Sequence, residues 1–382
     1  MKIKFNKKVL EDAVTDALCA VSDKNTIPAI EGIRFKTEKN GNCSLTSYDL
    51  EKGFRTEIPC DCTEGGNYII NAQKLSRIIR MMPDDFIDIS INDKNVAEIS
   101  CGKSKFELHS IDGSTFPTLP ELAGDRGFSV TAGNLRKMIN QTLFAVATSD
   151  QRPMLCGALF KITDGNLKIV ACDGNRLAIR EKVCEIINKN ADGADLDLSF
   201  IVPGRTLSQL MKLMSDEEEV IEIYLGRKHV IFKLENKTFF SRLIDTDYID
   251  FDRVIPKAPK THVVCRRSVL IGALERASLV TEDKALGQSK SCVRCEFVDG
   301  VLKISSVSVS GSVYDEVLTD KEGDDIVIGF NCRYLLDALR ASDGEDIKID
   351  LSNPLVSIII TATKNTEGEN YLYMVCPVKM KE

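Results

Sequence analysis

An α+β fold made of three copies of one domain is predicted, each copy with two helices and a β-sheet. Six segments carry apolar residues at helical spacing, and segments of alternating apolar and polar residues lie between and after them. This order of elements occurs three times, with helical segments repeating at offsets between 125 and 135 residues. A recurring order at a near-constant offset is typical of duplicated domains rather than of one large domain.

The helices are predicted from apolar residues three and four positions apart, which form one face of an α-helix. The first helix of each copy shows this spacing at Leu10, Val14, Ala17, Leu18 and Val21, at Leu135, Met138, Ile139, Leu143 and Val146, and at Leu270, Ala273, Leu274, Ala277 and Val280. The second helix shows it at Leu75, Ile78, Ile79 and Met82, at Leu207, Leu210, Met211 and Met214, and at Leu335, Ala338 and Leu339.

The strands are predicted from residues that alternate between apolar and polar, the pattern of a half-buried strand. Matched strands are expected at Ile87–Ile91, Ile221–Leu225 and Ile347–Leu351, and a second matched set at Asn42–Leu45, Asn166–Ile169 and Val301–Ile304. Proline- and glycine-bearing stretches near 117–127 and 256–259 separate the copies. We therefore expect domains at 1–124, 125–256 and 257–382.

The composition is that of an ordinary globular protein. The 382 residues include 43% hydrophobic side chains and carry a net charge of −7. The start has no apolar stretch typical of a signal peptide, and no run of about 18 apolar residues could span a membrane. A cytoplasmic protein that binds no membrane is expected. The thirteen cysteines include a lone CxxC at Cys292 and Cys295 but no second pair, so no metal site is expected.

Charge is segregated between the helices and the rest of the chain. The six helical segments together carry +9, so the remainder of a chain with net charge −7 carries −16. Basic helices could follow the phosphates of a nucleic acid through electrostatic attraction without reading any base. The alternative is that these basic residues simply lie on solvated helix faces. The positive charge bias of the helices, taken together, makes this alternative less favourable.

Candidate catalytic motifs are weak throughout the sequence. The three histidines, His109, His229 and His262, are far apart and lack the spacing of a metal site. Gly102–Ser104 lacks the glycine that a phosphate-binding loop needs and is interpreted as a turn. The acidic runs 216–219 and 192–197 are interpreted as solvated linkers. These observations favour a binding protein without a cofactor over an enzyme.

Four short stretches resemble the bacterial sliding clamp, the beta subunit of DNA polymerase III. Val170–Ala178 reads VACDGNRLA, similar to the family's VATDGHRLA, and Tyr373–Met380 reads YMVCPVKM, similar to its YVVMPMRL ending. Ile201–Pro203 and Phe330–Asn331 open helices as they do in the family. The resemblance covers the whole chain. It implies the DNA clamp fold, with two chains joined head to tail as a ring-forming homodimer and helices lining the hole.

The resemblance implies a processivity factor that encircles double-stranded DNA without sequence specificity. Its implied partners are the replicative DNA polymerase, an ATP-driven clamp loader and other proteins with a clamp-binding motif; the chain itself would be a non-catalytic subunit. Lys24, Arg152 and Lys284 match the family's DNA-contacting loop positions. Further DNA-contacting candidates lie on the helices: Arg77, Arg80, Arg136, Lys137, Arg205, Lys212, Arg266 and Arg340.

The resemblance also implies an apolar pocket that binds a short peptide motif of partner proteins. An apolar groove with a few polar groups suits aromatic or aliphatic anchors. The implied pocket residues are Cys172, Gly174, Asn175, Arg176, Leu177, Ile249, Val254, Leu355, Ser357, Met374, Cys376, Pro377, Val378 and Lys379. The family usually has Thr, His and Pro in place of Cys172, Asn175 and Ile249, and methionine in place of Cys376 and Val378. A changed motif preference is therefore expected.

The implied contact between the two chains of the ring uses two different surfaces, as a head-to-tail interface must. Phe106 and Leu108 on a strand of the first copy match one surface, and Leu279 and Val280 at the end of a helix in the third copy match the other.

Two other classes of protein are considered beside a clamp. A metal-dependent nuclease would need clustered carboxylates on facing strands, and the sequence does not predict such a cluster. A repeat scaffold that binds only protein would share the threefold repeat and the pocket, but basic helices would bring it no advantage. Binding of duplex DNA separates the scaffold from a clamp, and metal-dependent cleavage separates the nuclease.

Overall fold

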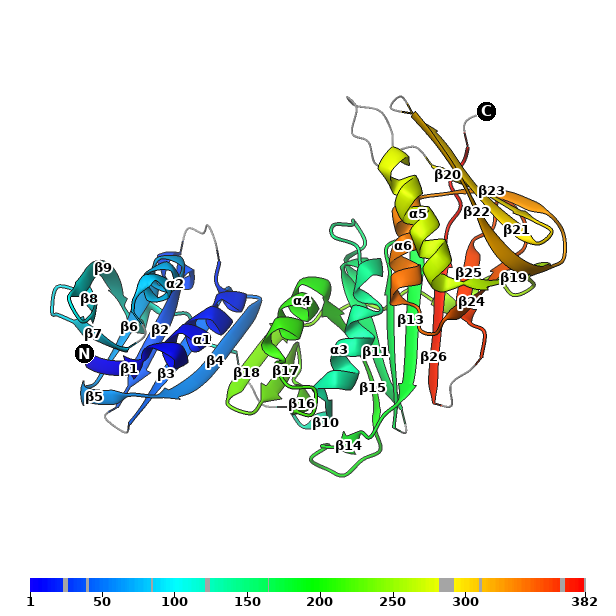
Figure 1. Cartoon of the computed structure of the whole chain (residues 1–382). Helices are drawn as coiled ribbons and strands as arrows, with labels where there is room; N and C mark the ends of the chain where they lie inside the picture. Colours follow the sequence, from blue (N-terminus) through cyan, green and yellow to red (C-terminus); the bar gives the residue numbers. More distant parts are fainter. Residues whose placement is uncertain are drawn as a thin grey trace. The chain divides into compact units, whose positions relative to one another are not determined.

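Two compact units make up the chain, and each is built on its own antiparallel sheet (Figure 1). The computed structural model describes residues 1–22, 27–38, 41–83, 85–120, 124–163, 165–281, 292–308, 311–364 and 368–380. Unit 1 comprises 1–134, 186–196 and 205–243; unit 2 comprises 135–185, 197–204 and 244–382. None of the helices in the described part has the length and apolarity needed to span a membrane.

Helices form at all six predicted places. Asparagine side chains cap three of them: Asn6, Asn71 and Asn331 each accept a hydrogen bond from a backbone N–H of the first turn. The helices are α1 (Lys7–Ala17), α2 (Ala72–Met81), α3 (Ala132–Asn140), α4 (Gly204–Leu213), α5 (Arg267–Thr281) and α6 (Cys332–Ala341).

The first helices of copies one and two are shorter than predicted. The apolar spacing predicted one helix through Val146, but α3 ends at Asn140 and a separate 3₁₀ turn covers Leu143–Ala145. The buried Thr142 hydroxyl donates to the carbonyl oxygens of Met138 and Ile139, at 2.9 and 3.2 Å, and so satisfies groups left free at the helix end. In copy one, α1 likewise gives way to a 3₁₀ turn at residues 18–20.

Unit 1 contains, within the described ranges, a sheet of fourteen strands. Their order across the sheet is β14 (Ile187–Asn188), β10 (Arg126–Thr131), β16 (Val220–Leu225), β17 (His229–Leu234), β18 (Lys237–Arg242), β4 (Lys52–Pro59), β3 (Asn42–Tyr48), β2 (Gly32–Thr37), β6 (Gly66–Asn71), β9 (Ser104–Asp112), β8 (Val96–Cys101), β7 (Phe86–Ile91), β1 (Lys2–Asn6) and β5 (Asp61–Glu64).

Unit 2 contains, over the residues described, a sheet of twelve strands. Their order is β15 (Asp197–Pro203), β11 (Gly157–Thr163), β12 (Asn166–Cys172), β13 (Arg176–Val183), β26 (Glu369–Val375), β25 (Ile358–Ala362), β24 (Asp346–Leu351), β19 (Thr261–Arg266), β22 (Gly311–Glu322), β21 (Val301–Ser308), β20 (Val293–Val298) and β23 (Ile326–Phe330).

Each sheet joins strands from two successive copies of the repeat. In unit 1, β18 of the second copy pairs with β4 of the first, and Phe240 lies opposite Gly53. In unit 2, β26 of the third copy pairs with β13 of the second, and Met374 lies opposite Leu177. We call these pairings the first and second junction. Because the strand order on both sides is the same, residues at the two junctions can be compared position by position.

Two sequence motifs set aside as structural are turns in the fold. Gly102 has φ +56° in the tight turn between β8 and β9, a conformation that glycine adopts readily. In the acidic run after α4, the Asp216 carboxylate accepts a hydrogen bond from the Glu218 N–H at 3.0 Å. The thirteen cysteines are all free thiols.

Candidate functional site: an apolar cluster and two basic helices

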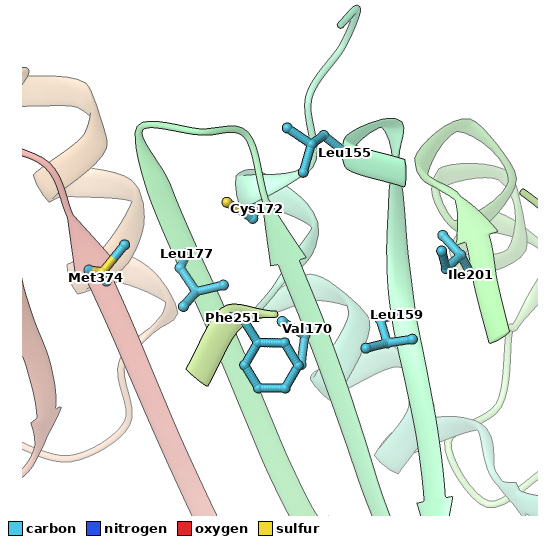
Figure 2. Packing of buried hydrophobic residues seen from close by; sticks show 8 residues of the cluster. All are labelled: Leu155, Leu159, Val170, Cys172, Leu177, Ile201, Phe251 and Met374. Atoms are coloured by element: carbon cyan, nitrogen blue, oxygen red, sulfur yellow. The ribbon is translucent and has the colours of Figure 1, made fainter. Parts of the chain in front are cut away.

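An apolar cluster covers the second junction on one face of the unit 2 sheet. Figure 2 shows side chains of this cluster on neighbouring strands, with Phe251 lying across them from a 3₁₀ turn; the strands are β15, β11, β12, β13 and β26. The cluster comprises buried Leu155, Leu159, Val170, Cys172, Leu177, Ile201, Phe251 and Met374, with partly buried Ala147, Met154, Ile179, Ile244, Tyr248, Ile249, Ile255, Leu372 and Cys376. It therefore brings together five of the predicted pocket residues: Cys172, Leu177, Ile249, Met374 and Cys376.

The hairpin between β12 and β13 shapes one end of this cluster. Asp173 accepts hydrogen bonds from the backbone N–H groups of Asn175 and Arg176, at 2.9 and 3.1 Å. Gly174 sits at φ +89°, where a side chain would be strained. The Asn175 carbonyl accepts the Cys376 N–H at 2.9 Å, which ties the hairpin to the chain that follows β26.

Arg176 has a structural role that its place in the predicted pocket did not reveal. Its guanidinium forms ion pairs with Asp173 at 2.9 Å and with Asp337 of α6 at 2.7 Å. It also lies over the Tyr334 ring, 4.3 Å from the centroid, and against Phe144. These contacts use the charge of Arg176 inside the fold and leave little of it for a ligand.

Two thiols lie among the apolar side chains of the cluster. Burial raises the pKa of Cys172, whose sulfur accepts a hydrogen bond from the Gly174 N–H at 3.3 Å. Cys376 is partly exposed, and its sulfur accepts from the Ser357 hydroxyl at 3.3 Å. A protonated thiol behaves as a small apolar group, so both replacements keep the cluster apolar while changing its shape.

The other predicted pocket residues are more exposed. Leu355 is 89% exposed, and Val254 and Val378 are also exposed. Pro377 is half-buried and Lys379 is exposed. The backbone N–H of Val378 donates to the Gly329 carbonyl at 2.7 Å, which holds the C-terminal segment against the third copy.

The segment that lies across the cluster contains the predicted pocket residues Ile249 and Val254, but its aromatic residues were not predicted. Tyr248 and Phe251 both contribute, and the buried Tyr248 hydroxyl has no hydrogen-bond partner within the described residues. Burial raises the pKa of Tyr248. The signal that could have revealed it is a repeat: Phe116 follows the last strand of copy one, as Phe251 follows the last strand of copy two, and each belongs to an apolar cluster.

Two helices of unit 1 present exposed basic side chains. Arg77 and Arg80 lie on α2, and Arg205 and Lys212 lie on α4, one or two helical turns apart. The structure shows no carboxylate paired with any of these four within the described part of the chain. Their charges are therefore available to an anionic partner such as a phosphate backbone.

The basic candidates of unit 2 are more often engaged inside the fold. Lys137 pairs with Asp343 and Glu369, Arg152 with Asp150, Arg266 with Glu345 and Asp346, and Arg340 with Glu275. Arg136 is half-buried, and its Nε has no partner among the described atoms. Lys24 and Lys284, the two loop positions implied by the resemblance, lie outside the described residues.

Comparisons with known proteins cover all three copies. Models of the N-terminal, central and C-terminal domains of the DNA polymerase III beta subunit match residues 1–120, 129–250 and 252–377. The beta sliding clamp of Halalkalibacterium halodurans is 30% identical and that of Bacillus subtilis 28%, each alignment covering 99% of this chain and all of the relative. The chain belongs to the bacterial sliding clamp family. Its beta subunits are non-catalytic.

Solved sliding clamps share the fold along the full length. The crystal structure of the clamp from Bacillus subtilis superposes with a TM-score of 0.90 at 28% identity, and one from Pseudomonas aeruginosa with 0.87 at 28% identity, both covering all of each chain. The predicted threefold α+β clamp fold is thereby confirmed, and so is the identification of the family from a few short motifs.

The residues predicted for the ring interface lie on two different elements, β9 and α5. Phe106 lies on β9 and is 43% exposed, while Leu108 on the same strand is half-buried. Leu279 lies at the end of α5 and is 79% exposed, and Val280 is half-buried. Exposed large apolar side chains such as Phe106 and Leu279 are compatible with an interaction surface.

Proposed function

We propose that the chain forms a head-to-tail homodimeric ring around double-stranded DNA and tethers the replicative polymerase through a peptide bound at the apolar cluster. The observation that carries this proposal is the cluster itself. It lies where two copies of the repeat meet, and three further predicted pocket residues outside it, Leu355, Val254 and Val378, are exposed. Apolar side chains left exposed beside a well-packed cluster favour a partner that inserts its own apolar anchors.

The DNA part of the proposal rests on α2 and α4. Four exposed cations without carboxylate partners among the described residues can contact phosphates through long side chains or water. Such contacts read no bases and weaken as salt rises, because binding releases counterions from the DNA. A ring held by topology needs little affinity per contact and can slide.

Retention on circular DNA tests this part. The wild type, loaded with the clamp loader, should stay on nicked circular duplex and leave once the circle is cut. Changing Arg77, Arg80, Arg205 and Lys212 to glutamate should abolish retention at moderate salt. The exposed turn residue Lys94, changed to glutamate, provides a charge control that should have no effect. A wild type that remains on linear DNA as long as on circles would contradict encirclement and favour direct binding.

Peptide binding at the cluster is tested by a fluorescent peptide carrying the clamp-binding motif. Met374→Ala should weaken binding by about tenfold or more, because anchors in apolar pockets dominate such interfaces. Val220→Ala shortens an exposed aliphatic side chain of unit 1, outside the cluster, and serves as the control. Equal loss in both variants would show that binding is not localised at the cluster.

In the proposed ring, the strand pairing between two chains repeats the pairing seen at the two junctions within one chain. β9 occupies the place in copy one that β18 and β26 occupy in copies two and three, and β22 occupies the place of β4 and β13. Over 104–108 and 311–318 these two strands each have one unpaired edge within the described residues. By analogy with Phe239 opposite Phe54, Phe106 would lie opposite Val313 of the partner subunit.

Light scattering at several concentrations tests the ring. The wild type should have the mass of two chains, and Leu279→Glu should reduce it to one. A wild type that stays a single chain when concentrated would contradict the ring and leave the protein-binding scaffold as the better interpretation. The division into domains at 1–124, 125–256 and 257–382, the cytoplasmic location, and the loader and other motif-bearing partners belong to the same proposal.

A further inference from the structure

Four equivalent positions on one face of the sheet are polar or charged at the first junction and apolar at the second. Across β2, β3, β4 and β18 of unit 1, the residues directly opposite one another are Arg34, Thr46, Arg55 and Thr238. Across β11, β12, β13 and β26 of unit 2, the equivalent residues are Leu159, Val170, Ile179 and Leu372. The apolar row belongs to the cluster described above, and the polar row is not among the predicted DNA, peptide or ring contacts.

The polar row lies on the sheet face turned away from the helices of unit 1. Side chains alternate between faces along a strand. Ser47, next to Thr46, donates a hydrogen bond to the Ala17 carbonyl of α1 at 2.6 Å, so Ser47 is on the helix side. Thr46 and the residues opposite it must therefore be on the other side.

Arg34 lacks the partner that a half-buried guanidinium normally has. The described residues provide it with no carboxylate, and its Nε is buried without a hydrogen-bond acceptor. It lies over the Phe116 ring, with Cζ 4.7 Å from the centroid. Burial, and then the nearby charge of Arg55, lower the pKa of Arg34. Two guanidinium groups thus lie close together with little compensating negative charge.

Thr46 and Arg55 add further donors to the same row. The Thr46 hydroxyl is fully buried and has no partner among the described atoms. Arg55 has a single ion pair, with Glu57 at 3.3 Å, and both side chains are about half exposed, so this pair is weak. A groove of about 690 Å³ opens beside Arg55. Its charged lining comprises Arg55, Lys233, Lys237, Glu57, Glu222 and Glu235, and it does not include Arg34 or Thr46.

The third copy of the repeat shows how an arginine at this position is otherwise satisfied. Arg294 is equivalent to Arg34, and it forms an ion pair with Glu296. In copy one the residue equivalent to Glu296 is Lys36, which pairs elsewhere, with Glu38. Arg34 therefore has a cation where Arg294 has its anion.

We propose that Arg34, Thr46 and Arg55 form a binding site for an oxyanion of the phosphate or carboxylate type. Guanidinium groups present paired N–H donors that match two oxygens of such an anion. An anion between Arg34 and Arg55 would offset their mutual repulsion and accept hydrogen bonds from Arg34 Nε and the Thr46 hydroxyl after a small movement of the arginine side chains. The site is independent of the proposed peptide and DNA contacts.

Thermal unfolding of the full chain, titrated with phosphate or malonate at constant ionic strength against chloride, tests the site. A ligand that binds only the folded state raises the midpoint of unfolding as its concentration increases. Three variants probe the row: Arg34→Leu and Thr46→Val install the residues of unit 2, and Glu57→Gln frees Arg55. Lys94→Gln removes one positive charge from an exposed turn and is the control.

The expected result is a rise in midpoint for the wild type and Lys94→Gln, with the response abolished in Arg34→Leu and strongly reduced in Thr46→Val. Loss of a hydrogen bond to a charged group should weaken binding about tenfold or more. Glu57→Gln should respond at lower anion concentration. A response to phosphate alone assigns a phosphorylated ligand, and a response to malonate alone assigns a carboxylate. The same response in Arg34→Leu as in the wild type, or none in the wild type, would overturn the proposal.

Discussion

The two junctions pair equivalent strands in the same register, yet one is filled by aromatic rings and the other by aliphatic and sulfur-containing side chains. At the first junction Gly53 faces Phe240, whose ring lies 5.7 Å from that of Tyr48. At the second junction the equivalent places hold Leu177, Met374 and Cys172. Backbone pairing is the same in both, so three side chains decide whether a junction is packed with aromatic or with aliphatic groups.

The filled junction depends on one close approach. A Cβ built on Gly53 would meet the Phe240 ring at 2.2 Å, well inside contact distance. Glycine therefore makes room for an aromatic ring that lies flat on the neighbouring strand, whereas two medium-sized side chains share the space at the second junction. Gly53 and Phe240 should therefore be sensitive to mutation, and changing both could convert the first junction toward the second.

The largest expected effect is that of Phe240→Ala. It removes a fully buried ring and leaves a cavity beside Tyr48, which should lower the free energy of unfolding of unit 1 by about 3–5 kcal/mol. Hydrogen exchange of the β4 and β18 amides measures it locally. Peptide binding at the second junction should be unchanged. Full protection of those amides in the variant would show that the ring does not hold the first junction together.

The next largest effect is expected on the helix-facing side of the second junction. Arg180 occupies there the position that Thr56 occupies in the first junction. Arg180 is fully buried, and its Nη2 contacts Glu369 at 2.5 Å and Asp343 at 2.7 Å. Glu369→Gln leaves this cation with less compensating charge, so unit 2 should lose about 3 kcal/mol. Glu235→Gln, in an exposed turn of unit 1, is the control.

Glu369 also predicts a pH dependence. Burial opposes ionisation of its carboxyl, but hydrogen bonds from Lys182 and Lys137 outweigh burial and lower its pKa. A lowered folded-state pKa stabilises the fold above the unfolded value of about 4.3, and that stability is lost as pH falls through the folded value. Unit 2 of the wild type should therefore lose stability below about pH 4.3, and Glu369→Gln should flatten the curve. A curve of unchanged slope would contradict this role.

A smaller effect tests conversion of the first junction. Gly53→Leu forces a side chain against the Phe240 ring and should destabilise unit 1 by about 1–3 kcal/mol. Adding Phe240→Met recreates the Leu and Met pair of the second junction and should recover part of that loss. Chemical denaturation of the single and double variants gives the coupling energy. Strictly additive losses would show that the two positions do not compensate each other.

The threefold order of helices and strands was predictable because apolar spacing is a local property of the sequence. Ile87–Ile91 and its two equivalents became β7, β16 and β24 nearly as predicted. The end of α3 was not predictable from spacing, because the Thr142 hydroxyl rather than a change in the apolar pattern satisfies the carbonyls there.

The candidate site was predictable in part, through resemblance more than through pattern. Cys172, Leu177 and Met374 come from three strands, and only the family motif connects them. The ion pairs of Arg176 with Asp337 and of Lys137 with Glu369 were invisible, because each joins residues more than 150 positions apart. The placement of Arg34 beside Thr46 and Arg55 emerges only once strand register is known.

The smallest effect lies in the two hairpins that end the junctions. Asp49 and Asp173 make matching hydrogen bonds to the two backbone N–H groups at each turn, but the left-handed position is Leu50, φ +76°, in one and Gly174, φ +89°, in the other. A leucine in this conformation costs about 1 kcal/mol. Leu50→Gly should therefore raise the stability of unit 1 by up to about 1 kcal/mol, and Gly174→Ala should lower that of unit 2 by a similar amount. Urea unfolding, followed by a probe in each unit, measures the two changes in stability separately. The two variants should change stability in opposite directions, because the same left-handed backbone position is occupied by leucine in one hairpin and by glycine in the other. A loss of stability in both variants would mean that the side chain of Leu50 makes contacts that outweigh its backbone strain.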